Sequence, residues 1–337
     1  MSASISTIGA FRHGGRLREA MAAFPDAPRP WLDLSTGINP EPWSGQRAPA
    51  DALRRLPDPR ELAELETIAA RAFGVADPGR VVATSGAEAA LRLLPGLIGG
   101  GEVALLAPIY GGHAESWAAS SPSLVTSLED PRAVAADVLV LVNPNNPDGR
   151  RIDRDTLAAL AAERSDAGRW TVVDESFGEV APELSVAELE IDRLVILRSF
   201  GKFYGLPGAR LGFLIGNKIF AREFRALVGD WPIGADALAL GIEAYADAAW
   251  RGRTRAWLAT QAGAVDTVLA KAGLKPLGGC DLFRWVETPD AHGLFTRLCA
   301  RGILTRPFAD RPDRLRLGLP SRNDFNRFER DIHAVTS

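Results

Sequence analysis

The residues Ser199-Phe200-Gly201-Lys202 follow directly after an apolar run at 194–197, and Arg210 comes eight residues after the lysine. A lysine at the end of a buried strand can lose its proton through desolvation, which leaves the neutral amine that a Schiff base requires. Ser199 and Arg210 supply a hydroxyl and a planar guanidinium, and both suit a phosphate ester. An isolated serine and lysine at this spacing would be more typical of a solvated basic turn.

Asp174 stands at the end of another apolar run, at 171–173. A carboxylate at the end of a buried strand is costly unless it is paired, and the protonated nitrogen of a pyridine ring is a suitable partner. Considered alone, Asp174 fits a helix N-cap or a structural salt bridge equally well. Together with Lys202 and Arg210 it predicts pyridoxal 5'-phosphate (PLP), held on Lys202 as a Schiff base and paired with Asp174.

A sharp turn, Asn-Pro-Asn-Asn-Pro-Asp-Gly at 143–149, ends the apolar run at 138–142. Asparagine-proline and aspartate-glycine pairs form turns in any protein, so turn formation alone would explain this sequence. Its place at a strand end indicates a second role, in which Asn146 donates an amide hydrogen bond to a ring oxygen.

Two further segments could contact the same cofactor. The main-chain N–H groups of Gly86, Ala87 and Glu88, at the start of an expected helix, can point at an anion and add the positive end of the helix dipole. Tyr110 offers an aromatic face that can stack on a flat ring. A serine-glycine turn before a helix is common, and a single tyrosine is more often a core or surface residue.

Alternation of apolar runs and helical patterns sets the expected fold. The apolar residues at 61–73 recur at helical spacing and Gly74 follows them, so the segment predicts an amphipathic helix. Short apolar runs without polar alternation are typical of strands covered on both faces. Helical patterns at 88–97 and 153–164 lie between them, which predicts an α/β protein with a mainly parallel sheet and ligands at the carboxyl ends of its strands. The expected strands are at 103–106, 138–142, 171–173, 194–197 and 211–215.

A smaller α+β domain is expected after the large one. An alanine-rich stretch to about residue 272 predicts long helices, and short strands are expected at 282–286, 303–304 and 315–319. The opening segment is rich in proline and glycine, which suits an extended arm better than a regular element. We therefore expect an N-terminal arm at 1–37 that joins the small domain, a large PLP-binding domain at 38–235 and a small C-terminal domain at 236–337.

Composition excludes several classes of partner. The chain has 39 basic and 42 acidic side chains, a net charge of −3, so it has no basic field for nucleic acid or for a membrane surface. Cys280 and Cys299 have no metal-type spacing and are too few for a disulfide framework. Met1–Ala10 lacks a secretory pattern, and no stretch approaches the roughly 20 apolar residues of a transmembrane helix. We expect a cytoplasmic protein without zinc.

These motifs, in this order and on successive strand ends, resemble the fold type I PLP enzymes of the class I/II aminotransferase superfamily over roughly residues 35–320. The resemblance implies a homodimer with sites at the interface. It also implies a role for each motif: Lys202 as the Schiff base, Asp174 on the pyridine nitrogen, Asn146 on the ring hydroxyl, Tyr110 stacked on the ring, and Ser199, Arg210 and the amides of Gly86, Ala87 and Glu88 on the phosphate.

Two segments resemble the substrate-binding parts of that superfamily. The sequence at 314–319 is similar to the strand whose arginine binds the substrate carboxylate, which places Arg316 in that role; an exposed strand with outward arginines is the alternative. Gly37-Ile38-Asn39-Pro40 resembles the segment that closes over the same carboxylate, so Gly37 and Asn39 are further candidates.

Within the superfamily, His13-Gly14-Gly15 and the segment 32–40 are similar to the L-threonine-O-3-phosphate decarboxylases of cobalamin biosynthesis, in which this arm helps to hold the substrate phosphate. His13 and Gly14 are therefore candidates for that phosphate. Phe177 also matches these decarboxylases, whereas histidinol-phosphate aminotransferases have a tyrosine there.

The sequence departs from its relatives at two positions. Leu56 replaces a tyrosine that reaches the neighbouring subunit's cofactor, and Pro320 stands where a second substrate-binding arginine is expected.

The expected reaction is decarboxylation of L-threonine O-3-phosphate to (R)-1-aminopropan-2-ol O-phosphate. An aminotransferase for a phosphorylated substrate, such as histidinol-phosphate aminotransferase, is the alternative, because the bond held perpendicular to the ring decides which reaction follows. A catalytically silent PLP-binding partner of the pathway is the non-enzyme alternative.

Overall fold

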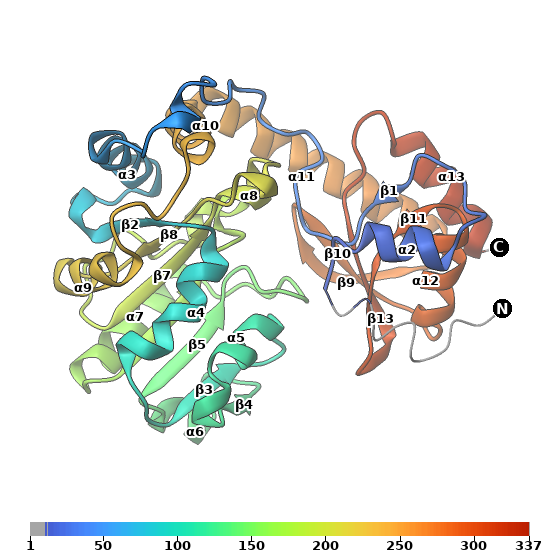
Figure 1. Ribbon diagram of the computed structural model, residues 1–337. Helices are drawn as coiled ribbons and strands as arrows, with labels where there is room; N and C mark the ends of the chain where they lie inside the picture. The colour runs from blue at the N-terminus through green and yellow to red at the C-terminus, as the bar shows by residue number, and fades with distance from the viewer. Residues whose placement is uncertain (1–10, 12, 337) are drawn as a thin grey trace. The chain divides into compact units, whose positions relative to one another are not determined.

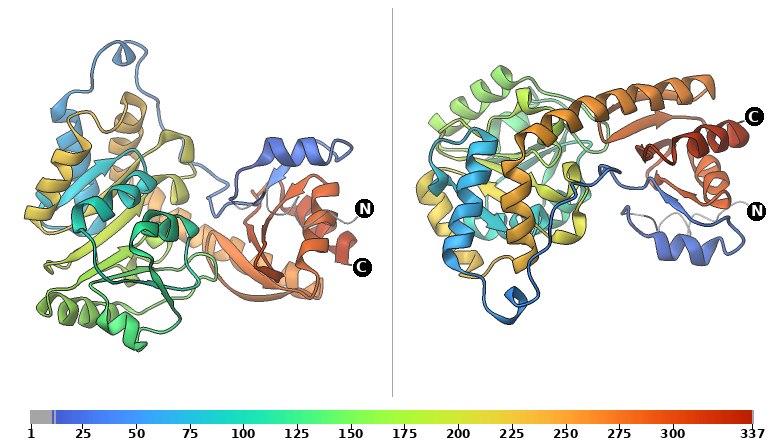
Figure 2. Two further views of the ribbon diagram at one scale, coloured as in Figure 1. Left: turned by 60° about the horizontal axis from the view of Figure 1, so that its bottom comes forward. Right: turned by 90° about the horizontal axis from the view of Figure 1, so that it is seen from above.

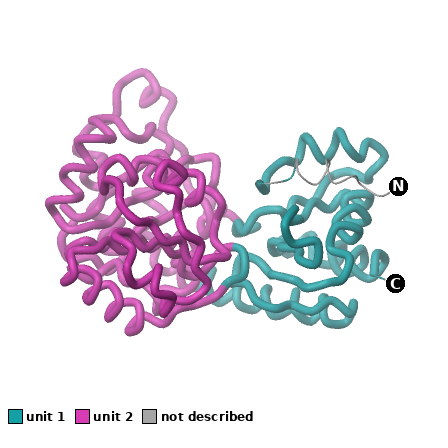
Figure 3. Tube along the Cα trace, turned by 90° about the horizontal axis from the view of Figure 1, so that it is seen from below, with its two compact units in different colours: residues 1–41, 147–149, 253–337 teal, residues 42–146, 150–252 magenta. Residues whose placement is uncertain are grey.

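The computed structural model describes residue 11 and residues 13–336, which form two compact units (Figure 3). Unit 1 takes residues 1–41, 147–149 and 253–337, and unit 2 takes residues 42–146 and 150–252. The division falls inside α11 (Ala248–Lys271), which Figure 2 shows as one long helix. Met1–Ala10, where the sequence predicted no secretory pattern, lies outside the described residues.

Unit 2 is built on a seven-stranded sheet in the order β2-β8-β7-β6-β5-β3-β4 (Figure 1). Every adjacent pair is parallel except the two that β8 forms, with β2 and with β7. The predicted mainly parallel α/β sheet is therefore confirmed. The strands are β2 (Val81–Thr84), β3 (Val103–Leu106), β4 (Ser123–Val125), β5 (Val138–Val142), β6 (Trp170–Asp174), β7 (Leu194–Ser199) and β8 (Gly212–Ile215).

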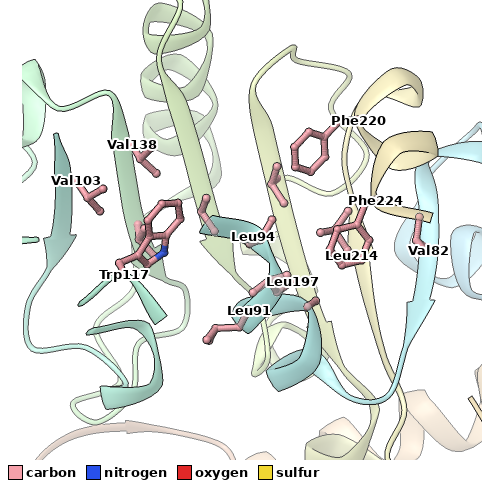
Figure 4. Close-up of a cluster of buried hydrophobic side chains, with 14 of the residues drawn as sticks. Val82, Leu91, Leu94, Val103, Trp117, Val138, Leu197, Leu214, Phe220 and Phe224 are labelled. Carbon is pink, nitrogen blue, oxygen red and sulfur yellow. The ribbon is translucent and has the colours of Figure 1, made fainter. Parts of the chain in front are cut away.

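A cluster of buried apolar side chains fixes the first helix of the site against this sheet (Figure 4). Leu91 and Leu94 of α4 (Ala87–Ile98) pack in the same cluster as Leu197 of β7 and Leu214 of β8. Truncating one such core side chain to alanine typically costs about 2–5 kcal/mol, so α4 is firmly held. The N-terminus of α4 is thereby set beside the ends of the central strands.

The helix predicted at 61–73 is present as α3 (Pro59–Phe73). Asp58 caps its N-terminus by accepting a hydrogen bond from the N–H of Arg60, and Pro59 occupies its first position. Gly74 ends it in a left-handed conformation with φ of 76°. The other helices of unit 2 are α5 (Gly111–Ser116), α6 (Pro131–Ala135), α7 (Arg154–Asp166), α8 (Phe200–Phe203), α9 (Lys218–Val228) and α10 (Ala235–Ala246), and α11 begins there.

Unit 1 contains a four-stranded antiparallel sheet in the order β12-β13-β10-β9 and a parallel pair of β1 with β11. Its helices α12 (Ala291–Ala300) and α13 (Phe325–Thr336) accompany the larger part of α11. The strands are β1 (Leu32–Asp33), β9 (Lys275–Cys280), β10 (Phe283–Glu287), β11 (Ile303–Leu304), β12 (Arg306–Phe308) and β13 (Arg311–Gly318).

The expectation that the N-terminal arm has no regular element is wrong for part of it, because α2 (Leu17–Ala23) is a helix. Its sequence, LREAMAA, consists of strong helix formers and contains neither glycine nor proline. Ala20 on this helix is fully buried. The prolines and glycines of the arm lie on either side of α2, which is why the segment as a whole resembled a loop.

Neither a membrane span nor a metal centre is found in the part of the chain that the structure describes. None of its helices is both long and apolar enough to cross a bilayer. No group of three or more His, Cys, Asp or Glu side chains there is placed to hold a metal ion.

Candidate active site

A cavity of about 300 Å³ opens in unit 2 at the carboxyl ends of the central strands. The ends of parallel strands meet at one edge of the sheet, so polar residues that follow different strands converge there. All the residues predicted to bind the cofactor line this cavity: Gly86, Ala87, Glu88, Tyr110, Asn146, Asp174, Ser199, Lys202 and Arg210.

Lys202 reaches the cavity from the short helix α8, which follows β7 directly. Its Nζ atom lies 5.7 Å from the centre of the Phe177 ring, and Phe177 is buried and lines the same cavity. Among the residues that line the cavity, Lys202 is the sole amine. A nucleophilic amine beside an apolar wall is the arrangement that covalent catalysis by lysine requires.

Gly86 and Arg210 form one end of the cavity. A Cβ atom on Gly86 would overlap Nη2 of Arg210 and lie 3.1 Å from its Cζ, and the φ of Gly86 is +90°. The positive φ favours glycine here, and any larger residue would also force the Arg210 guanidinium to move. Arg210 also has a left-handed backbone, with φ of 52°, a conformation that costs a non-glycine residue about 1–3 kcal/mol. This end combines a guanidinium with the first amides of α4, a donor set for a phosphate.

Asp174 forms the floor of the cavity and is held by two neighbours. Nε2 of His113, on α5, lies 3.0 Å from Oδ2 of Asp174, and the N–H of Ser176 donates to Oδ1 at 2.8 Å. Burial by itself would raise the pKa of Asp174, but the hydrogen bond with His113, its charge and the hydrogen bonds of Ser176 together lower the pKa below its usual value. Asp174 is thus kept as a carboxylate in a buried position.

Tyr110 and Asn146 lie on two loops that a hydrogen bond from the Asn145 side chain joins. Nδ2 of Asn145 donates to the carbonyl of Pro108 at 2.8 Å, which links the turn at 143–149 to the loop that carries Tyr110. The Tyr110 hydroxyl donates to Glu88 at 3.3 Å, and its ring meets His113 edge to face with centres 6.2 Å apart. The two loops therefore form one wall of the cavity.

A buried ion-pair network lies at the ends of β6 and β7. Arg198 precedes Ser199 in the chain, and its guanidinium donates to Glu175 and to Glu179, each at 2.7 Å. Glu175, the neighbour of Asp174, also accepts hydrogen bonds from Ser185 Oγ at 2.6 Å and from the N–H of Val186 at 2.8 Å. The network joins the end of β6 to the end of β7, so it fixes Asp174 relative to Ser199.

The residues predicted to bind the substrate all belong to unit 1, and the structure groups several of them. Arg316 on β13 is buried, with 4% of its surface exposed, and its Nη2 donates to the carbonyl of Ser35 at 3.0 Å. Ser35 Oγ in turn accepts a hydrogen bond from the N–H of Gly15 at 2.8 Å. A Cβ atom on Gly14 would lie 2.9 Å from the carbonyl carbon of Ser35, so only glycine fits.

The remaining predicted residues lie on the same N-terminal segment. His13 is partly buried next to Gly14, and Gly37 and Asn39 are buried beyond β1. Asn39 accepts a hydrogen bond from the N–H of Glu41 at 2.9 Å. The arm around Gly14 and Ser35 is thus packed against the strand that carries Arg316.

Arg306 was missed by the sequence analysis. It pairs directly with Arg316 across β12 and β13, so the two side chains project from the same face of the sheet. Its guanidinium lies 4.9 Å from the centre of the Phe308 ring. Two adjacent arginines repel each other, and an anion bound between them would relieve that repulsion.

Neither position where the sequence departs from its relatives supplies the group expected there, a tyrosine hydroxyl at Leu56 and a guanidinium at Pro320. Pro320 uses its carbonyl to accept a hydrogen bond from Gln261 at 3.0 Å, and Leu56 is exposed over 63% of its surface.

Comparison with known proteins places the chain among PLP-related enzymes. The sequence pattern that defines aminotransferase class I and II matches residues 29–328. A threonine-phosphate decarboxylase of Pseudomonas aeruginosa is 37% identical over 314 residues, which cover 92% of this chain and 93% of that protein. A threonine-phosphate decarboxylase of a Sinorhizobium species is also 37% identical and covers 91% of this chain and 92% of its own length. Histidinol-phosphate aminotransferase 1 of Bradyrhizobium diazoefficiens is 28% identical and covers 82% of this chain and 84% of its own.

Solved structures agree on the fold. The histidinol-phosphate aminotransferase of Sinorhizobium meliloti, in complex with pyridoxal-5'-phosphate, superimposes with a TM-score of 0.82 at 21% identity and covers all of this chain and 98% of its own. The L-threonine-O-3-phosphate decarboxylase of Porphyromonas gingivalis gives a TM-score of 0.74 at 19% identity, and the match covers 90% of this chain and 98% of that one. The match to the family pattern extends over most of the sequence, and the fold agrees with it. The chain therefore belongs to the aminotransferase class I and II family.

Proposed function

We propose that this protein is a PLP-dependent lyase that converts L-threonine O-3-phosphate to (R)-1-aminopropan-2-ol O-phosphate and CO2, a step of cobalamin biosynthesis. One observation carries the assignment of cofactor chemistry: Asp174, at the end of β6, lines the same cavity as Lys202 and Arg210, which follow β7. The choice of reaction draws on the threonine-phosphate decarboxylases at 37% identity over nine-tenths of the chain, since the aminotransferase relative is more distant at 28%.

The residues present fit PLP. The guanidinium of Arg210, the amides at the start of α4 and the Ser199 hydroxyl are donors for its phosphate, and Gly86 leaves room for close approach. Asp174, kept ionised by His113, is the partner for the ring nitrogen. The Asn146 amide and the Tyr110 ring suit the ring oxygen and the ring face. Lys202 is the amine that holds the cofactor covalently.

The chain's own residues then have distinct tasks. Bound PLP supplies an electron sink for the bond that breaks next to the substrate nitrogen. Asp174 stays negative and so holds the proton on the ring nitrogen. With PLP and substrate bound, the Nζ atom of Lys202 would be the group that delivers a proton to the substrate carbon. Phe177, which has no hydroxyl, leaves the ring oxygen to Asn146.

For the substrate, we assign the carboxylate to Arg316 and the phosphate to Arg306, with His13 and Gly14 as further contacts and Gly37 and Asn39 beside the carboxylate. The carboxylate assignment rests on the burial of Arg316, whose guanidinium uses a main-chain carbonyl as a hydrogen-bond acceptor. The phosphate assignment rests on the direct pairing of Arg306 with Arg316. Arg306 would supply the charge that Pro320 cannot.

We also propose that the protein works as a homodimer in the cytoplasm. Leu53, Leu56 and Trp231 are exposed over 67%, 63% and 54% of their surfaces, and a contact with a second copy would remove such apolar side chains from water. Cys280 and Cys299 are both buried, and two cysteines are too few for a disulfide framework, as a reducing compartment favours.

The test is to incubate PLP-loaded protein with L-threonine O-3-phosphate and to measure CO2, the phosphorylated amino alcohol and keto acid together. We expect CO2 and the amino alcohol in equal amounts and no keto acid. Lys202→Ala should abolish turnover, whereas Lys218→Ala, at an exposed lysine paired with Asp77, should leave it unchanged.

Two outcomes would overturn the proposal in different ways. Transfer of an amino group from glutamate to a keto acid, without CO2, would establish the aminotransferase alternative. A visible absorption band of bound PLP that no amino acid alters would establish a silent cofactor-binding protein.

A further inference from the structure

A second cavity in unit 2, of about 540 Å³, shares no lining residue with the cofactor cavity. It lies between the ends of β3 and β4 and the helix α7. Its wall includes the apolar side chains of Leu128, Ile152 and Leu160, each partly buried. Its volume falls within the range of about 300–1,000 Å³ that is typical of small-molecule sites.

Three arginines also line this cavity, Arg150, Arg164 and Arg169. Two carboxylates, Glu129 and Glu163, lie among the lining residues, but neither Arg164 nor Arg169 forms an ion pair within the part of the chain that the structure describes. The lining therefore carries an excess of positive charge on an apolar wall.

Arg164 is the most constrained of the three. With 3% of its surface exposed, it donates to the carbonyls of Ala133, Ala136 and Trp170 at 2.8, 2.9 and 3.0 Å, and no described residue accepts from its Nε. Burial, with the charge of Arg169, lowers the pKa of Arg164 to about 10. A buried cation with a depressed pKa is poorly compensated, and an anion in the cavity would compensate it.

The cavity is separate from the cofactor site but adjoins its loops. Arg150 donates to the carbonyls of Ala107 and Leu106 at 3.2 and 3.3 Å, just before the loop that carries Tyr110. The carbonyl of Arg150 accepts from the N–H of Asn145 at 2.8 Å, within the turn that carries Asn146. A ligand there would contact Arg150, which is hydrogen-bonded to both of these segments.

We propose that this cavity is a binding site for a small organic anion with an apolar body, distinct from the cofactor and substrate sites. The apolar wall takes the body of the ligand, the guanidinium of Arg169 takes its carboxylate, sulfonate or phosphate, and the buried charge of Arg164 adds to the attraction. The site does not depend on which reaction the enzyme catalyses.

The test uses 8-anilinonaphthalene-1-sulfonate as the probe and N-phenyl-1-naphthylamine, the same ring system without the sulfonate, as its neutral counterpart. Both are titrated by calorimetry into the PLP-loaded protein. Thr156→Trp fills the cavity from the exposed surface of α7, and Ala159→Trp adds the same side chain at an exposed position of that helix outside the cavity. We expect one saturable site for the sulfonate, weakened about tenfold or more by Thr156→Trp and unchanged by Ala159→Trp.

Charge is tested separately. Arg169→Gln should weaken the sulfonate about tenfold and leave the neutral compound unaffected, whereas Arg151→Gln, at an exposed arginine outside the cavity, should change neither. The circular dichroism and the visible absorption of each variant show that it is folded and loaded. Equal weakening by the two tryptophan variants, or equal affinity for the charged and neutral compounds, would mean adhesion to exposed apolar surface and would overturn the proposal.

Discussion

Nε2 of His113 lies 3.0 Å from Oδ2 of Asp174, and both side chains are almost completely buried. The pair lies at the floor of the cavity where Asp174 is assigned to the ring nitrogen of PLP. Burial opposes the charge of a carboxylate, and His113 is the largest of the influences that overcome it. The histidine is therefore a positioning residue, which acts on the cofactor through the ionisation of Asp174.

Replacing His113 with asparagine should make cofactor retention sensitive to mild acid. The folded-state pKa of Asp174 is depressed, so the stabilisation from its ionised form is present above the unfolded pKa and is lost as the pH falls through the folded pKa. Without His113 the folded pKa rises, and the loss should begin at higher pH. Absorbance of PLP retained after gel filtration at a series of pH values measures the midpoint. His292→Asn, which removes a histidine bound to the carbonyl of Phe308, is the control. An unchanged midpoint in His113→Asn would contradict this role.

Gly86→Ala should weaken PLP binding because the new Cβ would displace the guanidinium of Arg210. The positive φ of Gly86 adds backbone strain of about 1–3 kcal/mol. We expect the PLP dissociation constant to rise about tenfold or more, as measured by fluorescence titration of the cofactor-free protein. Gly96→Ala in the same helix has no heavy atom within 4 Å of its Cβ and should bind PLP normally. Equal affinity of the two variants for PLP would show that Arg210 does not bind the cofactor phosphate.

Arg198→Met should destabilise the fold far more than the loss of one surface ion pair. The variant leaves Glu175 and Glu179 buried without their shared cation, and breaking such a network typically costs about 3–5 kcal/mol. Chemical denaturation gives the free energy of unfolding. The double variant Arg198→Met with Glu179→Gln should recover part of the loss, since one uncompensated charge is gone. A double variant less stable than Arg198→Met would show that the carboxylates are not the source of the penalty.

Much of the large-unit fold follows from local patterns in the sequence. Buried parallel strands are continuous apolar runs, so the strands at 103–106 and 138–142 could be located to the residue. Strand direction has no such signature, which is why the antiparallel setting of β8 between β2 and β7 could not be predicted. The helix at Leu17–Ala23 was missed because the glycines before it and the prolines after it made the whole segment resemble a loop.

The same distinction applies to the site, where local patterns could be predicted from the sequence and long-range contacts could not. Residues that follow an apolar run, such as Asp174 and Lys202, could be recognised from position alone. His113 could not, because 61 residues separate it from Asp174 and its short helix has no periodic signal. Arg306 depends on the register of β12 with β13, which shifts between Pro307 and Phe308, and no sequence rule fixes such a shift.

The pairing of Arg306 with Arg316 predicts that the two arginines bind different groups of the substrate, which steady-state kinetics can distinguish. If Arg306 binds the substrate phosphate, Arg306→Gln should raise KM for L-threonine O-3-phosphate about 10- to 100-fold. It should leave the much slower reaction of L-threonine, which has no phosphate, nearly unchanged. Arg316→Gln should impair both substrates, because both carry the carboxylate.

Arg311→Gln, at an exposed arginine of the same strand as Arg316, controls for the loss of one positive charge from this sheet. Rates of CO2 release over a range of substrate concentrations give KM and kcat for each variant. An effect of Arg306→Gln that is equal for the two substrates would place Arg306 on the carboxylate or in a structural role. A KM effect confined to the phosphorylated substrate requires the guanidinium to contact the phosphate, because a general loss of structure would lower kcat for both compounds.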